Sequence, residues 1–228
     1  MQSTRYLTKL ARQGDCEANF QLGFRLAFGK KHSQLRPWNK IYKCWMIAAI
    51  GGHMRAMFYI GTCYDHGYGV KKDLQSAFDW FLKAAKSGHR DAQYNIGFFY
   101  REGEVVRKNY KKMVAWYTLA AKAGLIDGQR DLGYSYFYGL GHPKDYEKAI
   151  YWYKKAAHQN DAKANYNIGL CYKEGDGVKQ SFKWARYYFS KAKQLGHKDA
   201  MRQLKELSSD KLTPTHTRFY VRVTRGRL

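Results

Sequence analysis

Histidine and cysteine are the residues of this 228-residue chain best suited to bind a metal or act as nucleophiles, and several recur at a fixed spacing. His53, His89 and His197 are separated by multiples of one interval, and Cys63 and Cys171 are separated by a multiple of the same interval. None belongs to an HExxH or CxxC motif, so this is not the spacing of a zinc or redox site. The recurrence instead indicates an internal repeat of 36 residues.

Phosphate-binding and nucleophile motifs are absent as well. The sequence has no GxxxxGK[ST] loop, and the stretch GYGVKK that begins at Gly67 returns in modified form as GLGHPK and GDGVKQ, which is typical of a repeated turn. No serine, cysteine or carboxylate stands out from the repeat in a reactive setting. We therefore predict a protein that is not an enzyme, with no cofactor and no metal site.

The repeat is clearest from Ala56 to Gly88, AMFYIGTCYDHGYGVKKDLQSAFDWFLKAAKSG. A small residue, an aliphatic residue followed by glycine, a tyrosine, a glycine turn, an aromatic residue and a closing alanine return every 36 residues. The glycine column is Gly61, Gly97, Gly133 and Gly169, and the aromatic column is Trp80, Trp116, Trp152 and Tyr188. A looser copy with Gly23 and Trp45 precedes these units, and a half copy begins at Ala200. One supersecondary unit stacked on copies of itself forms a solenoid.

The pattern AxxxLGxxYxxGxGV, followed by Asp, KAxxWxxKAA and a closing glycine, resembles the Sel-one-like repeats (SLR), which are relatives of the tetratricopeptide repeats. The resemblance covers roughly residues 15–207. It implies an all-α, right-handed superhelical solenoid of about five helix-turn-helix repeats. It also implies the usual role of such solenoids, which is to act as a scaffold or adaptor for other proteins.

The register predicts three segments. These are an N-terminal capping helix over 1–14, a solenoid over 15–207 with units near 15–52, 53–88, 89–124, 125–160, 161–196 and a half unit over 197–207, and a basic tail over 208–228. The tail is either a mobile arm or a segment that folds against the last unit or engages a partner, because it contains the apolar residues Phe219, Tyr220, Val221 and Val223.

Within the unit from Ala56 to Gly88, we expect helices over roughly 54–66 and 74–87. The residues expected to cap the second helices are Asp73, Asn109, Asp145 and Ser181. Gly61 and its equivalents fall inside a helix, where glycine costs up to about 1 kcal/mol relative to alanine. We expect a close approach of the second helix there, with the tryptophan column covering the gap.

Tetratricopeptide-type solenoids bind with the exposed, concave face of each first helix, and the resemblance assigns that face by register. The candidate partner-binding residues are Phe20, Phe24, Phe58, Tyr94, Phe98, Arg101, Arg130, Tyr134, Tyr138, Tyr166 and Lys173. We hypothesise that this face binds an extended protein segment or a helix with acidic or aromatic side chains. The alternative is that some of these rings pack between successive units.

The charge is strongly positive, with 41 lysines and arginines against 18 acids and a formal net charge of +23. Much of the excess falls on the second helices, which would form a broad positive face. Such a face attracts acidic proteins, anionic lipid or nucleic acid, so nucleic-acid binding is the alternative function. A basic protein lineage would give the same composition without a specific role.

The sequence predicts a cytoplasmic protein, because it has no apolar run of eighteen residues and no secretory signal at its start. Some secreted relatives of the family carry a cysteine pair that clamps each unit, and the four cysteines here do not form that pattern. Cys16 and Cys44 lie within one unit and could be neighbours, but reduced thiols are expected. The sequence gives no indication of the oligomeric state.

Overall fold

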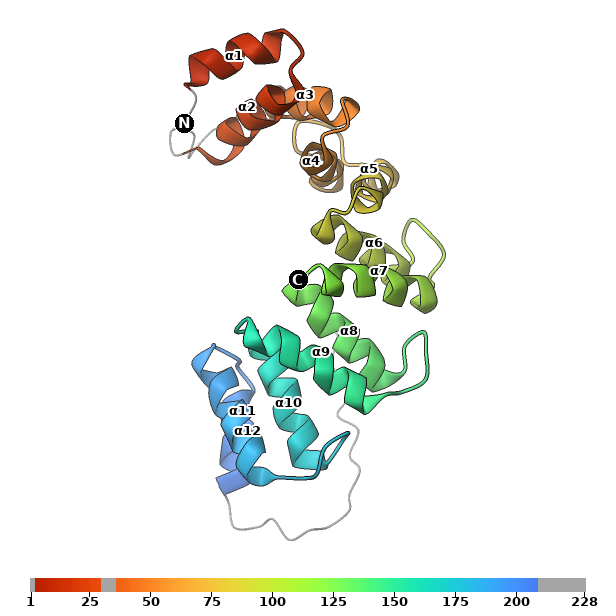
Figure 1. The fold of residues 1–228 in the computed structure, drawn as a ribbon, viewed down its shortest axis with the longest axis vertical. Coiled ribbons are helices and arrows are strands. Elements are labelled where there is room, and N and C mark those ends of the chain that lie inside the picture. Colours follow the sequence, from red (N-terminus) through yellow and green to blue (C-terminus); the bar gives the residue numbers. More distant parts are fainter. Residues whose placement is uncertain (1–2, 30–35, 209–228) are drawn as a thin grey trace.

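The structure is a computed structural model that describes residues 3–29 and 36–208. This part of the chain is all α-helical and contains no strand, as predicted (Figure 1). The helices are α1 Thr4–Arg12, α2 Cys16–Phe28, α3 Trp38–Ile50, α4 Met54–His66, α5 Leu74–Lys86, α6 Arg90–Glu102, α7 Tyr110–Lys122, α8 Ile126–Tyr138, α9 Tyr146–His158, α10 Ala162–Glu174, α11 Phe182–Gln194 and α12 Ala200–Ser208. The hypothesis about the apolar stretch of the tail lies outside the described residues.

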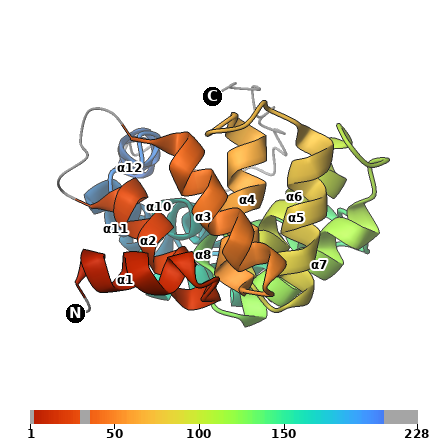
Figure 2. The same cartoon turned by 90° about the horizontal axis from the view of Figure 1, so that it is seen from above.

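The helices form five antiparallel pairs that stack along the long axis of the molecule (Figure 1). In each pair, α2 with α3 through α10 with α11, the even-numbered first helix packs on the odd-numbered second helix. Helix α1 packs on α2 through Leu7 and Ala11, and α12 packs on α11. The stack bends, and a view along it places α5 and α7 at the periphery and α8 and α10 nearer the middle (Figure 2).

The helix starts follow the predicted caps. The carboxylate of Asp73 accepts hydrogen bonds from the backbone N–H groups of Gln75 and Ser76, and α5 begins at the next residue. The equivalent side chains of Asn109, Asp145 and Ser181 cap α7, α9 and α11. Each of these acceptors satisfies an amide that has no partner within its helix.

The glycines inside the first helices are explained by a ring pressed against the backbone. A Cβ atom at Gly61 would lie 2.6 Å from the ring of Phe81, which is too close for two carbon atoms. The same contact recurs with rings at 36-residue intervals, namely Tyr117, Tyr153 and Phe189, and with Trp45 in the first unit. The prediction that the tryptophan column covers the glycines is therefore wrong by one position. Trp80 lies one residue earlier, about 100° around the helix, and is only partly buried.

We expect Gly61→Ala to lower the free energy of unfolding by about 1–3 kcal/mol, because the added methyl group must displace the Phe81 ring. This loss opposes the higher helix propensity of alanine, which alone favours the substitution by about 1 kcal/mol. Urea unfolding measures the difference. The double variant Gly61→Ala/Phe81→Leu should lose less free energy of unfolding than the sum of the two single variants, because the smaller side chain leaves room for the methyl group.

The control is Ala115→Gly, because Ala115 is exposed on α7 and this change alters helix propensity without adding a methyl group to a buried contact. It should cost about 1 kcal/mol. A Gly61→Ala variant as stable as the unmodified protein would show that the ring does not enforce the glycine.

Candidate interaction surface on the first helices

Three of the predicted groove rings are contacts between successive units. Phe20 is only 4% exposed, and its ring stacks on His53 with centroids 4.2 Å apart. The Phe58 ring stacks on His89 at 4.4 Å, and the Tyr166 ring stacks on His197 at 4.1 Å. Each histidine lies just before the first helix of the next unit, or before α12. The interpretation that some rings pack between units therefore describes this column.

The histidines also hold the helix ends. Nδ1 of His53 accepts a hydrogen bond from the backbone N–H of Ala56, and Nδ1 of His89 accepts one from that of Ala92. This geometry needs a neutral ring with the proton on Nε2, because a protonated imidazole has no acceptor nitrogen. Burial lowers the pKa of His89 below 6.5, and the nearby Arg55 and Arg90 lower it further, while Asp91 opposes them. The same side chain thus caps a helix and stacks against the preceding unit.

The fourth unit replaces the ring and histidine with an ion pair. Arg130 occupies the position of Phe58, and its Nη1 lies 3.1 Å from Oδ2 of Asp161, the N-cap of α10. Arg130 also contacts Asp127 at 2.6 Å and Asp131 at 3.0 Å. Burial opposes its charge, but the three carboxylates outweigh that effect and raise the pKa of Arg130. This guanidinium is held by its own protein and is not free to bind a partner.

Tyr94 is also engaged within the protein. Its ring stacks on Tyr117 with centroids 5.1 Å apart, and its hydroxyl donates a hydrogen bond of 2.8 Å to Oδ2 of Asp131. Burial and the charge of Asp131 raise the pKa of Tyr94, so the phenol stays protonated. Asp131 thereby joins α6 to α8.

Four of the candidate residues form an exposed group on α6 and α8. Phe98, Tyr134 and Tyr138 are 39%, 39% and 42% exposed, and Arg101 is partly exposed. The guanidinium of Arg101 lies over the Phe98 ring at 4.6 Å, and the rings of Tyr134 and Tyr138 are 4.4 Å apart. Tyr134 is also close enough to feel the charge of Arg101, which counteracts the rise of its pKa caused by burial. We call Phe98, Arg101, Tyr134 and Tyr138 the central cluster.

The remaining two candidates lie toward the ends of the solenoid. Phe24 is partly buried in a cluster with Phe20 and Tyr59. Lys173 donates hydrogen bonds to Oε1 of Gln203 at 2.8 Å and to Oε2 of Glu206 at 3.0 Å, and so fastens α12 to α10. The structure therefore brings together only the central cluster as an exposed group.

Asp131 is the residue that the sequence analysis missed. Its carboxylate accepts a hydrogen bond from Tyr94, pairs with Arg130 and lies 3.7 Å from Nη1 of Arg101. Asp131 therefore holds these polar side chains in place beside the central cluster. The signal was available, because the preceding and following units have Asn95 and Asn167 in this column. A carboxylate in place of an amide beside an arginine marks a contact specific to this unit.

The cysteines form no site in the structure. All four are free thiols, and burial raises the pKa of Cys63 and of Cys171 to about 12. Across residues 3–29 and 36–208, no group of three His, Cys, Asp or Glu side chains is placed to hold a metal ion. None of the helices described is long and apolar enough to cross a membrane.

The family model of the Sel1 repeat matches residues 55–89, 90–125, 126–161 and 162–197, which is more than half of the chain. The chain belongs to the Sel1-repeat family. The matched units coincide with the helix pairs from α4–α5 to α10–α11, and the resemblance seen in the sequence is confirmed. A search of curated proteins finds no match.

Solved structures of this family are similar to the chain over most of its length. A protective antigen of uropathogenic Escherichia coli strains with an SLR fold is 30% identical, with a TM-score of 0.85 over 91% of this chain and 44% of that protein. A Sel1 repeat protein from Oxalobacter formigenes is 28% identical, with a TM-score of 0.76 over 85% of this chain and 78% of its own. The chain spans less than half the length of the Escherichia coli protein. Sel1-repeat proteins generally mediate protein–protein interaction.

We expect the free energy of unfolding to fall as the pH is lowered from 7.5 to 5.5. The pKa of His89 is lower in the folded chain than the ordinary value of 6.5, so the unfolded chain binds more protons in this range and is favoured. Burial lowers the pKa of His197 in the same direction. The loss begins near pH 6.5 and is complete below the folded pKa values. For one histidine, the loss in the free energy of unfolding is at most what one helix cap contributes, about 0.5–2 kcal/mol.

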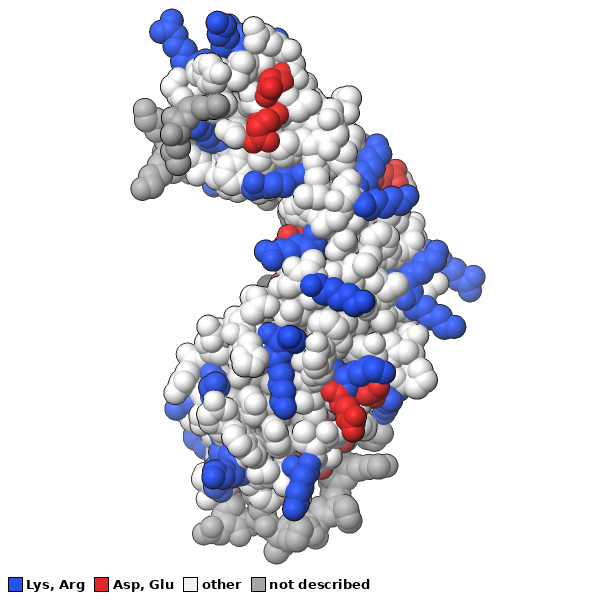
Figure 3. Space-filling model, viewed as in Figure 1, with Lys and Arg blue, Asp and Glu red and all other residues white. Residues whose placement is uncertain are grey.

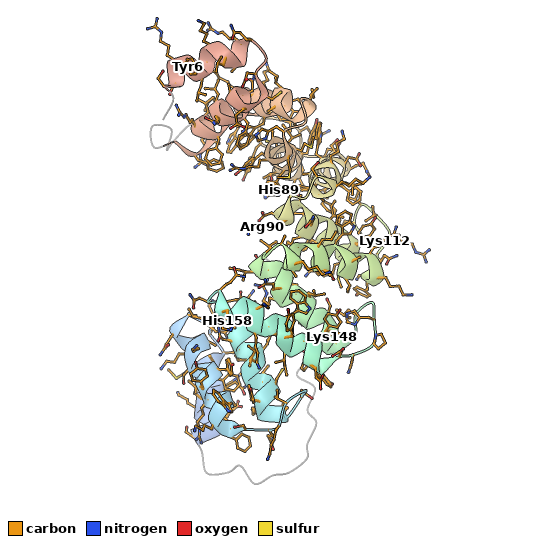
Figure 4. The ribbon with its side chains drawn as sticks, in the orientation of Figure 1. Tyr6, His89, Arg90, Lys112, Lys148 and His158 are labelled. Carbon is orange, nitrogen blue, oxygen red and sulfur yellow. The ribbon has the colours of Figure 1, made fainter. Side chains whose placement is uncertain are left out.

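His89→Asn should reduce this pH dependence, because the amide oxygen can cap α6 and does not titrate. The control is His158→Asn, since His158 lies exposed at the end of α9, away from His89 (Figure 4). Urea unfolding at the two pH values gives the comparison. Equal pH dependence in the unmodified protein and in His89→Asn would contradict the assignment.

Proposed function

We propose that this Sel1-repeat protein is a non-catalytic scaffold that binds a protein partner through the central cluster. The observation that carries the proposal is the exposure of Phe98, Tyr134 and Tyr138 on the first helices α6 and α8 of two successive units. Large rings exposed side by side are typical of binding hot spots. Membership of a family that mediates protein interaction supports the same role.

The partner segment is proposed to be extended and to carry aromatic and acidic side chains. Phe98 and the pair of tyrosines offer ring faces and edges for aromatic contacts. Arg101 donates Nε–H to Glu102 at 2.6 Å, while its Nη1 is 3.7 Å from Asp131, beyond hydrogen-bond distance. An incoming carboxylate can therefore bind the outer edge of this guanidinium.

The first helices do not favour nucleic acid as the ligand of this face. Helices α2, α4, α6, α8, α10 and α12 together contain nine lysines and arginines and eight acids, so the face has almost no net charge. A phosphate backbone needs a continuous positive surface. Protein recognition by rings and one arginine fits this composition better.

We also propose that the protein works in the reducing cytoplasm. The support is that Cys44, Cys63 and Cys171 are buried free thiols, and that Cys16 is likewise unpaired. Disulfides are rare in that compartment, and buried unpaired thiols are stable there.

A library of immobilised twelve-residue peptides tests the ligand chemistry. We expect the protein to select peptides that contain both aromatic and acidic residues over peptides in which lysine replaces the acids. For a selected peptide, fluorescence anisotropy should show at least about tenfold weaker binding to Phe98→Ala/Tyr134→Ala, because hot-spot truncations cost about 2 kcal/mol or more. Arg101→Gln should weaken acidic peptides only.

The matched control is Tyr151→Ala, which removes an exposed ring from second helix α9. It should leave peptide binding unchanged. If the variants of the central cluster bind the selected peptides as tightly as the unmodified protein, this cluster is not the recognition surface.

A further inference from the structure

The positive charge of the protein is concentrated on one class of helix. Helix α1 and the second helices α3, α5, α7, α9 and α11 contain seventeen lysines and arginines and only two acids, Asp79 and Glu147. All seventeen basic side chains are exposed. The first helices, with nearly balanced charge, contribute almost nothing to the net charge of +23. Blue side chains extend along the whole molecule in the surface view, whereas red ones occur in a few small groups (Figure 3).

These exposed cations are also uncompensated. Among the seventeen, only Lys148 forms an ion pair within the described residues, at 2.8 Å from Oδ2 of Asp145. By contrast, Arg90, Arg101 and Arg130 of the first helices form ion pairs, and Arg130 contacts three carboxylates. The positive surface is therefore available to an external anion.

One outward stripe on each second helix is defined by positions i, i+3 and i+7, which share a helix face. In α9 the stripe reads Lys148, Tyr151 and Lys155, and in α11 it reads Trp184, Tyr187 and Lys191. Tyr151, Trp184 and Tyr187 are 53%, 47% and 44% exposed. Figure 4 shows Lys148 and His158 near opposite ends of α9, and Lys112 on α7.

The lysines of this stripe lie beside the rings. Nζ of Lys155 is 5.6 Å from the centroid of Tyr151, and Nζ of Lys191 is 4.8 Å from that of Tyr187. Helix α11 has no acidic residue between Phe182 and Gln194. The corresponding stripe of α7, with Lys112, Ala115 and Leu119, has no ring. We call Tyr151, Lys155, Trp184, Tyr187 and Lys191 the α9–α11 patch.

We propose that the α9–α11 patch binds single-stranded nucleic acid. The lysines contact phosphates, and the exposed rings stack with bases, which is the combination that single-strand-binding surfaces use. This surface lies on the second helices and is independent of the central cluster and of its protein partner. The inference rests on unpaired positive charges that alternate with exposed rings. The charges alone would be enough to bind a polyanion without bases, and the rings would then have no role.

A single strand fits better than a duplex or an acidic protein. In a duplex the base faces are covered by stacking, so only the phosphates would be recognised and the rings would have no role. An acidic protein or an anionic lipid also satisfies the lysines. Neither, however, offers flat π-systems at successive positions along a charged backbone. The rings are therefore the feature that the experiment must test.

Fluorescence anisotropy with a labelled fifteen-nucleotide oligouridylate measures binding to the full chain at 50 mM and 200 mM NaCl. We expect affinity to fall steeply with salt, with a slope of about −0.7 per phosphate contacted. Trp184→Ala/Tyr187→Ala should weaken binding at least about fivefold at both salt concentrations, because stacking does not depend on counterions. Phe98→Ala should leave oligonucleotide binding unchanged and, as a variant of the central cluster, weaken the selected peptide.

Two double variants that remove the same number of charges distinguish binding at the α9–α11 patch from non-specific electrostatic attraction. Lys155→Gln/Lys191→Gln removes two charges beside the rings. Lys86→Gln/Lys122→Gln removes two exposed charges from α5 and α7. We expect the first pair to weaken binding several-fold more than the second. Thermal unfolding of both lysine variants should match that of the unmodified protein, because all four side chains are exposed. Trp184→Ala/Tyr187→Ala should unfold at a lower temperature, because Trp184 packs beside Tyr172, and its circular dichroism at the assay temperature checks that it is folded.

Several results would overturn the proposal. One is that the two double lysine variants weaken oligonucleotide binding equally. Another is that Trp184→Ala/Tyr187→Ala binds the oligonucleotide with unchanged affinity. Either result would show that the binding is non-specific attraction of a polyanion. A fifteen-base-pair duplex, polyglutamate or vesicles that mix phosphatidylserine and phosphatidylcholine in a one-to-two ratio serve as competitors. If any of them displaces the oligonucleotide at equal charge concentration, the surface does not recognise single strands.

Discussion

The contact between one unit and the start of the next is the interaction on which the solenoid depends. A repeat of this kind touches only its neighbours, so its curvature and cooperativity are set at each junction. In this chain the junction joins a side chain on a first helix to the N-cap of the following first helix, as in Phe58 with His89 and Arg130 with Asp161. The residue that caps the start of the next first helix therefore also packs that helix against the preceding unit.

The chemistry of that junction decides which surface remains for partners. Where a ring closes the junction, as at Phe20, Phe58 and Tyr166, the ring is used for stability. In the third unit, Tyr94 instead contacts Tyr117 and Asp131. The junction between the fourth and fifth units is formed by the ion pair of Arg130 with Asp161. The neighbouring column, with Phe98 and Tyr134, stays exposed there. A local change in the stabilising contact thus coincides with the best candidate for recognition.

The sequence was sufficient for the fold because every unit repeats the same local signals. The glycine turn after α4 and the cap at Asp73 gave the ends of α4 and α5 to within one residue. It was insufficient for exposure, because the covering of Phe58 depends on His89 in another unit and the covering of Tyr94 depends on Asp131. The assignment of Trp80 to the glycine contact failed for a related reason, since adjacent positions on a helix point about 100° apart.

The distribution of charge follows from the same division of roles. First helices must pack against neighbours on both sides, and the partly buried Arg130 is accommodated there by ion pairs, among them the one with Asp161. The outward stripes of the second helices contact the first helix of their own unit, as Lys148 does at Tyr136 and Trp184 at Tyr172. The charged ends of their lysines stay exposed, and an unpaired lysine there costs little in packing. Solubility alone would explain lysines on those stripes. It does not explain Trp184 and Tyr187 among them, because exposed rings lower solubility. Trp184 packs beside Tyr172 and Tyr188, but it stays 47% exposed and Tyr187 stays 44% exposed. Two surfaces with different chemistry can therefore work on one solenoid without competing for the same side chains.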